Sequence, residues 1–182
     1  MSSERLSPFS YAVLVLVGEG GAGPHDLVRM MRRGRIYWTA PQSQWYAEPK
    51  RLERLGYLSS RRAPGRTNDR TLYRLTDAGR AALRDWLATP APFARIQDEP
   101  VVRLLAAEYA DDATVLAGLG TLRAEIADLR AGLVVAAGLE ATLPHRERAL
   151  RLNRRLAERI LDAHEEWLDA VEAELGGPGR AA

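Results

Sequence analysis

The spacing of apolar residues predicts three helices in the first part of the chain. Residues 11–17 are apolar almost all round, which is typical of a helix buried in the middle of a domain, and Ser7 and Pro8 are suited to begin it. Pro24 marks the start of a second helix that ends near Gly34. A third helix, from about residue 43 to residue 55, has one apolar side and one polar side, so we expect it to face both the core and a polar partner.

Two short strands and a fourth helix are predicted next. Gly56 supplies the left-handed stop of the third helix, and residues 57–60 and 71–75 show the partial alternation of strands on either side of an arginine-rich loop. Thr76 is suited to cap the fourth helix. The inward residues of that helix are expected to be Leu83, Trp86 and Leu87. A helix, a hairpin and a further helix in this order indicate the second half of a winged helix-turn-helix.

Long helices are predicted beyond a stiff linker at residues 89–92, where two prolines lie close together. Asp98 is suited to cap a short helix. From residue 111 the apolar positions recur alternately at four and three residues, as in a heptad seam: Val115, Leu119, Leu122, Ile126, Leu129, Leu133 and Ala136. After a break at residues 143–144, a second long helix carries one apolar face made of Leu152, Leu156, Ile160, Ala163, Trp167, Val171 and Leu175.

The predicted fold is mainly α with a small β-hairpin, and it divides into a winged helix-turn-helix domain and a coiled-coil-like domain. We expect the first at residues 1–90, a helical dimerisation and effector domain at 91–176 and a flexible tail at 177–182. Helices of about 30 residues span roughly 45 Å. Self-association is therefore favoured over the alternative, an antiparallel hairpin within one chain.

Composition and charge support this division. With 46% hydrophobic and 27% charged residues, the chain has the composition of a folded protein, and it lacks an apolar run long enough to span a membrane, so a cytoplasmic location is expected. The absence of cysteine excludes disulfides and thiolate metal sites. Residues 1–87 hold 15 Lys and Arg against 8 Asp and Glu, whereas residues 88–182 hold 11 against 16. A basic part joined to an acidic part indicates a module that binds nucleic acid, followed in the same chain by a module that does not bind nucleic acid.

Several motifs in the first part of the chain resemble those of the PadR family of transcriptional regulators. They are Leu6-Ser7-Pro8, Tyr11-Ala12-Val13-Leu14, Gly23-Pro24-His25, Ser43-Gln44-Trp45-Tyr46, Lys50-Arg51-Leu52-Glu53, Leu55-Gly56-Tyr57 and Tyr73-Arg74-Leu75-Thr76-Asp77-Ala78-Gly79. The likeness covers residues 5–90, and the remainder is similar in pattern to the long C-terminal helical domain of the larger members. One departure is that many members carry a Gly-Tyr pair after the histidine, where this chain has Asp26-Leu27.

The resemblance implies a homodimeric repressor that binds an inverted repeat in double-stranded DNA through the third helix and the wing. In several members an aromatic small molecule binds near the dimer centre and releases the DNA. A MarR-like regulator is the nearest rival within the same class. Such proteins usually run helices before the DNA-binding unit, whereas only about five residues precede the first predicted helix here.

Candidate DNA contacts come from the third helix and the hairpin. Ser43, Gln44 and Tyr46 lie at the end of the helix that usually enters the major groove, and Gln44 is suited to adenine. Lys50 and Arg51 are better placed for phosphate. The hairpin adds four arginines for the DNA backbone or the minor groove: Arg61, Arg62, Arg66 and Arg70. The alternative is that this basic loop is merely solvated.

Candidate ligand-binding residues are aromatic, and catalytic candidates are absent. An effector pocket would be lined by Tyr11, Trp86, Phe93, Tyr109 and Trp167, although aromatics at helical spacing more often belong to a core. The three histidines are scattered, and neither a nucleophile motif nor a glycine-rich phosphate loop is present, so neither an enzyme, a metal site nor a bound cofactor is expected. The main functional alternative is a winged-helix protein-interaction module that does not bind DNA.

Overall fold

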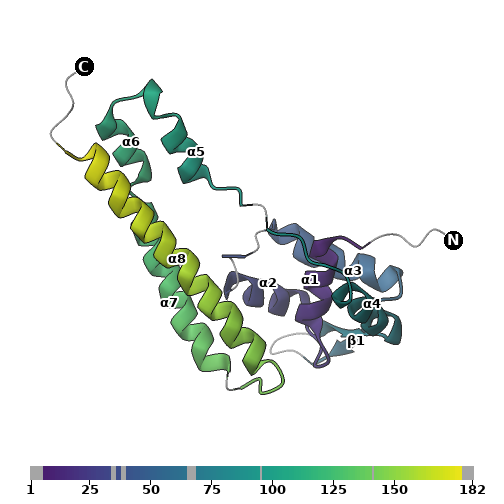
Figure 1. Cartoon of the computed structure of the whole chain (residues 1–182). Helices are drawn as coiled ribbons and strands as arrows, with labels where there is room; N and C mark the ends of the chain where they lie inside the picture. The colour runs from purple at the N-terminus through teal and green to yellow at the C-terminus, as the bar shows by residue number, and fades with distance from the viewer. Residues whose placement is uncertain are drawn as a thin grey trace. The chain divides into compact units, whose positions relative to one another are not determined.

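The computed structural model describes residues 6–33, 36–37, 40–64, 69–94, 96–140 and 142–177, and Figure 1 shows the whole chain. These residues form two compact units, 1–93 and 94–182. The predicted fold class is confirmed, because helices dominate and the sheet is a two-stranded antiparallel hairpin. Among the described residues, none of the helices combines the length and apolar character that crossing a bilayer requires.

In the part of the first unit that the structure describes, there are four helices and the hairpin. Their bounds are α1 Pro8–Val17, α2 Pro24–Arg33, α3 Gln42–Arg54, β1 Leu58–Ala63, β2 Arg70–Leu75 and α4 Asp77–Leu87. The predicted start of α1 is confirmed: the Ser7 hydroxyl accepts a hydrogen bond from the Ser10 amide, and Pro8 stands at the first helical position. The core gathers side chains from α1, α2, α3 and both strands, including Leu14, Leu27 and Leu52, which are fully buried.

Local backbone geometry sets the path from α3 through the hairpin into α4. Gly56 has a φ of +81°, which is the left-handed stop that the sequence predicts. The hairpin pairs Leu58 with Leu75, and Thr76 caps α4 by accepting a hydrogen bond from the Gly79 amide. A Cβ atom on Gly79 would lie 2.2 Å from the Tyr57 carbonyl oxygen, so only glycine allows α4 to approach the start of the hairpin this closely.

The second unit is entirely helical in the described residues. Its elements are α5 Glu99–Leu105, a short 3-10 helix Ala107–Tyr109 (η1), α6 Asp112–Leu119, α7 Leu122–Glu140 and α8 Glu147–Leu175. Asp98 caps α5 as predicted, because its carboxylate accepts a hydrogen bond from the Val101 amide. The helices α7 and α8 lie side by side in Figure 1 and are linked by ion pairs from Arg123 and Arg130 to carboxylates on α8.

Some expectations about the helices of both units differ from the structure. The heptad seam does not lie on one long helix, since Gly120 and Thr121 interrupt it between α6 and α7; glycine is a weak helix former. Four of its seven residues are buried within the chain: Val115, Leu119, Ile126 and Leu133. The buried residues of α8 are Ala157, Leu161, Leu168 and Val171, and of these only Val171 belongs to the predicted apolar face. In α4, Leu87 and Trp86 are 74% and 38% exposed rather than inward, whereas Leu83 packs against the core as predicted.

His164 joins the first turn of α5 to α8. Its Nε2 lies 2.8 Å from Asp98 Oδ2, and its Nδ1 lies 2.8 Å from the Ile160 carbonyl oxygen. Both oxygens are acceptors without a hydrogen of their own, so both contacts are hydrogen bonds only when the ring carries two protons. Burial opposes the charge, but the Ile160 carbonyl and Asp98 outweigh it and raise the pKa of His164 above its ordinary value.

Candidate DNA-binding surface

The outer side of α3 presents polar side chains that its own unit does not use. Ser43, Gln44 and Lys50 are exposed, and they form no hydrogen bond or ion pair with the described residues through their side chains. Trp45 points the other way: it is 3% exposed and meets the Phe9 ring edge-on at a centroid distance of 4.6 Å. The two-sided character that the sequence predicts for this helix is therefore confirmed.

Two other α3 candidates hold the helix in place. The Tyr46 hydroxyl is 2.9 Å from His25 Nδ1 on α2. Arg51 donates to Glu48 Oε1 at 2.9 Å, and the same oxygen accepts a hydrogen bond of 2.7 Å from the hydroxyl of Ser10, which is fully buried in α1. These contacts fix both the rotation and the distance of α3 relative to α1 and α2. Tyr46 and Arg51 thus already have partners before any ligand is bound.

The hairpin presents arginines beside α3. Arg61 and Arg62 on β1 are exposed, and neither side chain has a hydrogen bond or ion pair to a described residue. Because successive strand residues point to opposite faces, the two guanidinium groups cover both sides of the strand. Arg70 on β2 is different, since its Nη1 lies 3.1 Å from Asp26 Oδ2 on α2. Arg66 lies outside the described residues.

Asp26, at the position where the chain departs from the family pattern, connects three parts of the surface. Its Oδ2 accepts hydrogen bonds from the Gly23 amide and from Arg70, both at 3.1 Å, and its Oδ1 accepts one from Arg29 at 2.7 Å. Asp26 therefore caps the start of α2 and ties the base of the hairpin to it. It also offsets part of the positive charge on this side of the unit.

The contacts of Ser10, Glu48 and Asp26 were missed from the sequence. The sequence did contain an indication for Ser10: a single hydroxyl inside an otherwise apolar helix needs a hydrogen-bond partner when it is buried. Asp26 resembled an ordinary first-turn acid, which complements the helix dipole without any further role. Only the fold brings Asp26 next to Arg70, which lies 44 positions along the chain.

The aromatic residues proposed for an effector pocket are distributed over both units. The rings of Tyr11 and Trp86 stack at 4.7 Å with an angle of 8° between their planes. Phe93 and Tyr109 are 90% and 84% exposed, and Trp167 is half-buried on α8. Of the five candidates, only the first two are in ring contact.

An open groove of about 810 Å³ lies between α7 and α8. Apolar side chains and four arginines line it, together with two carboxylates: Leu133, Val134, Ala137, Arg130, Arg154, Arg155, Arg159, Glu158 and Asp162. Within the described ranges, His, Asp and Glu side chains do not gather in a group of three that could hold a metal ion.

A polar recognition helix beside a cationic two-stranded wing defines the class of winged-helix proteins. Residues 26–85 match the model of the transcriptional regulator PadR-like family. The first unit thus contains a PadR-like domain.

Relatives and solved structures agree with this assignment. The negative transcriptional regulator PadR of Bacillus subtilis is 32% identical over 93 residues, which is 49% of this chain and 50% of that protein. The chain thus aligns with about half the length of this curated relative. The crystal structure of Bacillus subtilis PadR with operator DNA has a TM-score of 0.73 at 21% identity, covering 94% of this chain and 99% of that one. Bacillus subtilis PadR with p-coumaric acid has a TM-score of 0.64 at 22% identity and covers 92% and 98%. These structural likenesses extend the shared fold to the second unit.

Proposed function

We propose that this chain is a sequence-specific DNA-binding transcriptional repressor that acts in the cytoplasm as a homodimer on an inverted-repeat operator. The observation that carries the proposal is the exposed face of the PadR-like domain, where Gln44 and Lys50 on α3 lie beside Arg61 and Arg62 on β1 without partners among the described residues. The helix fits the major groove, and the arginines fit the flanking phosphates or minor groove. The relative whose structure contains operator DNA supports the same use of this fold.

The roles divide by chemistry. Ser43 and Gln44 read base edges, Lys50 and the wing arginines hold phosphate, and Tyr46 contributes through its hydrogen bond to His25, which sets how the first turn of α3 meets the groove. Arg51 is ion-paired with Glu48, and Arg70 is ion-paired with Asp26. To contact a phosphate group, each arginine leaves its carboxylate partner or binds both at once. Direct readout therefore depends on few side chains, and Lys50 and the wing arginines supply the salt-dependent part of the affinity.

Release by a small, aromatic ligand is the second part of the proposal. It is supported by the relative that was solved with p-coumaric acid. In this chain the groove between α7 and α8 offers apolar side chains together with arginines, a combination suited to an aromatic acid. Titration of the DNA complex with p-coumaric acid tests this part: release of DNA supports it, and an unchanged complex at saturating acid contradicts it for this ligand.

DNA binding is tested with the segment immediately upstream of the coding region, searched for an inverted repeat with half-sites about one helical turn apart. Fluorescence anisotropy should show binding to this segment on the order of 10³-fold tighter than to a scrambled segment of equal length. Equal and weak binding to both segments would contradict the proposal and favour a protein-interaction module.

Substitutions in the wing separate phosphate contacts from base contacts. Arg61→Ala and Arg62→Ala should each weaken binding to every sequence and make the log-log salt dependence shallower by about 0.9. Gln44→Ala should instead reduce the preference for the operator while the slope stays the same. Arg84→Ala on α4 removes the same charge outside α3 and the hairpin, so it is the matched control. An unchanged slope in both wing variants would remove the wing from the interface.

A further inference from the structure

The outer side of α8 carries a row of arginines. Its four members are exposed, and we call them the arginine row: Arg148, Arg151, Arg155 and Arg159. At about 3.6 residues per turn, spacings of three and four residues place all four within roughly 80° of one another around the helix axis. The buried residues Ala157 and Leu161 lie on roughly the opposite side of the helix, so the arginine row faces away from the packing of its own unit.

The positive charge of the arginine row is only weakly compensated within the chain. The side chains of Arg148 and Arg155 form no hydrogen bond or ion pair with the described residues. Arg151 and Arg159 each form one ion pair, at 3.2 and 3.6 Å, with an acid three or four positions away on α8. Exposed pairs of this kind contribute little to stability, so an external anion displaces them at small cost.

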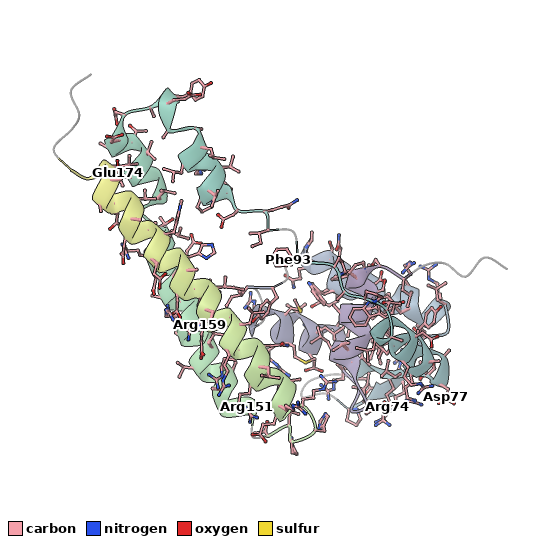
Figure 2. All side chains as sticks on the ribbon, in the orientation of Figure 1. Arg74, Asp77, Phe93, Arg151, Arg159 and Glu174 are labelled. Atoms are coloured by element: carbon pink, nitrogen blue, oxygen red, sulfur yellow. The ribbon has the colours of Figure 1, made fainter. Side chains whose placement is uncertain are left out.

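The charge of α8 changes sign at its middle, although residues 88–182 are acidic as a whole. Residues 147–160 of the helix contain five arginines and two glutamates, whereas residues 161–175 contain six acidic residues and neither lysine nor arginine. Figure 2 labels Arg151 and Arg159 in the first half and Glu174 near the end. The overall charge therefore conceals a concentrated cationic surface, which attracts an anion to the first half of α8 while the second half repels it.

We propose that the arginine row binds the phosphate backbone of the DNA that flanks the operator, as a second, sequence-independent contact besides α3 and the wing. This inference goes beyond the proposed function and rests on it, because operator binding is what brings the DNA to the chain. The row extends over about 16 Å of helix axis, and each DNA strand carries one phosphate for about every 3.4 Å of duplex axis, so several phosphates lie within its span.

The shape of the arginine row favours a linear polyanion over a small anion. A single phosphate or carboxylate group is bound by side chains that converge on one point, whereas these four follow the helix axis over about three turns. A duplex held by the first unit is a linear polyanion, and the tether between the units keeps it at a high effective concentration near α8. Arg155 and Arg159 also line the groove between α7 and α8, whereas Arg148 does not, so Arg148 separates a DNA contact from a ligand contact.

The length of the DNA tests this contact on the full chain, by fluorescence anisotropy at several salt concentrations and without any small ligand. One duplex covers only the inverted repeat, and a second adds about 15 base pairs of scrambled sequence, roughly one and a half helical turns, on each side. The log-log salt dependence of the wild type should be steeper on the long duplex, by about 0.9 for each arginine that binds a phosphate.

Alanine variants assign that difference to the arginine row. On the long duplex, Arg148→Ala should make the slope shallower by about 0.9 for each bound chain, which at 0.1 M salt corresponds to roughly eightfold weaker binding. The double variant Arg148→Ala/Arg155→Ala should remove most of the difference between the two duplexes. Both variants should bind the short duplex like the wild type, which also shows that they are folded. Arg103→Ala removes an exposed arginine of α5, outside the row, and is the matched control.

The outcomes separate this inference from the proposed function. Equal wild-type slopes on the two duplexes, or a steeper long-duplex slope that the double variant keeps, would overturn the contact through α8 while operator binding stands. A fully scrambled long duplex that binds as tightly as the operator would overturn sequence-specific binding, whereas a slope that still falls in the double variant would support the arginine row. A wild type that binds neither duplex would overturn both proposals.

Discussion

The buried hydroxyl of Ser10 should contribute more to stability than the exposed hydroxyl of Ser7, although the two belong to the same helix cap. Ser7→Ala removes the cap of α1, which costs about 1 kcal/mol. Ser10→Ala also loses its hydrogen bond to the Ser7 amide and, in addition, the 2.7 Å bond to Glu48. Hydrogen bonds to charged groups contribute about 1.5–3 kcal/mol. In the Ser10→Ala variant, Glu48 still accepts a hydrogen bond from Arg51, so the lower end of this range applies. Ser10→Ala should therefore lower the free energy of unfolding by roughly 2 kcal/mol.

Native-state hydrogen exchange is the suitable assay, because a chain with two units need not unfold in one transition. The amides of Val13 and Leu14, in the buried middle of α1, report the opening free energy of the first unit alone. Ser59→Ala, an exposed serine on β1, is the control and should change this free energy by less than about 0.5 kcal/mol. If Ser10→Ala costs no more than Ser7→Ala, the bond to Glu48 does not hold α3 against α1.

Three further predictions follow from particular contacts. Gly79→Ala should destabilise the first unit by roughly 1–3 kcal/mol in the same assay, because the new methyl group meets the Tyr57 carbonyl; an unchanged value would mean that α4 shifts freely. Asp26→Asn should free Arg70 for phosphate and steepen the salt dependence of DNA binding by about 0.9, whereas a wild-type slope would show that Arg70 stays on α2. The folded-state pKa of His164 is raised, so its contribution to stability is present below the ordinary histidine pKa and is lost as the pH rises through the raised value. Urea unfolding of the second unit at several pH values should show this loss, and His164→Gln should abolish it.

The features that follow from neighbouring residues were predictable from the sequence. The caps at Ser7, Thr76 and Asp98 and the stop at Gly56 all depend on one residue and its next few neighbours, and the structure confirms each of them. The two sides of α3 were predictable for the same reason, since periodicity alone separates Trp45 from the polar face.

Features that depend on tertiary contacts were not predictable. Apolar residues occupy two sides of α8, and periodicity cannot decide which side packs within the chain; the fold selects Leu161 and leaves Leu156 exposed. The interruption at Gly120 was hidden by a heptad pattern that continues across it. At the candidate surface, charge identified the arginines, but only the fold shows that Arg70 has a carboxylate partner while Arg62 has none among the described residues.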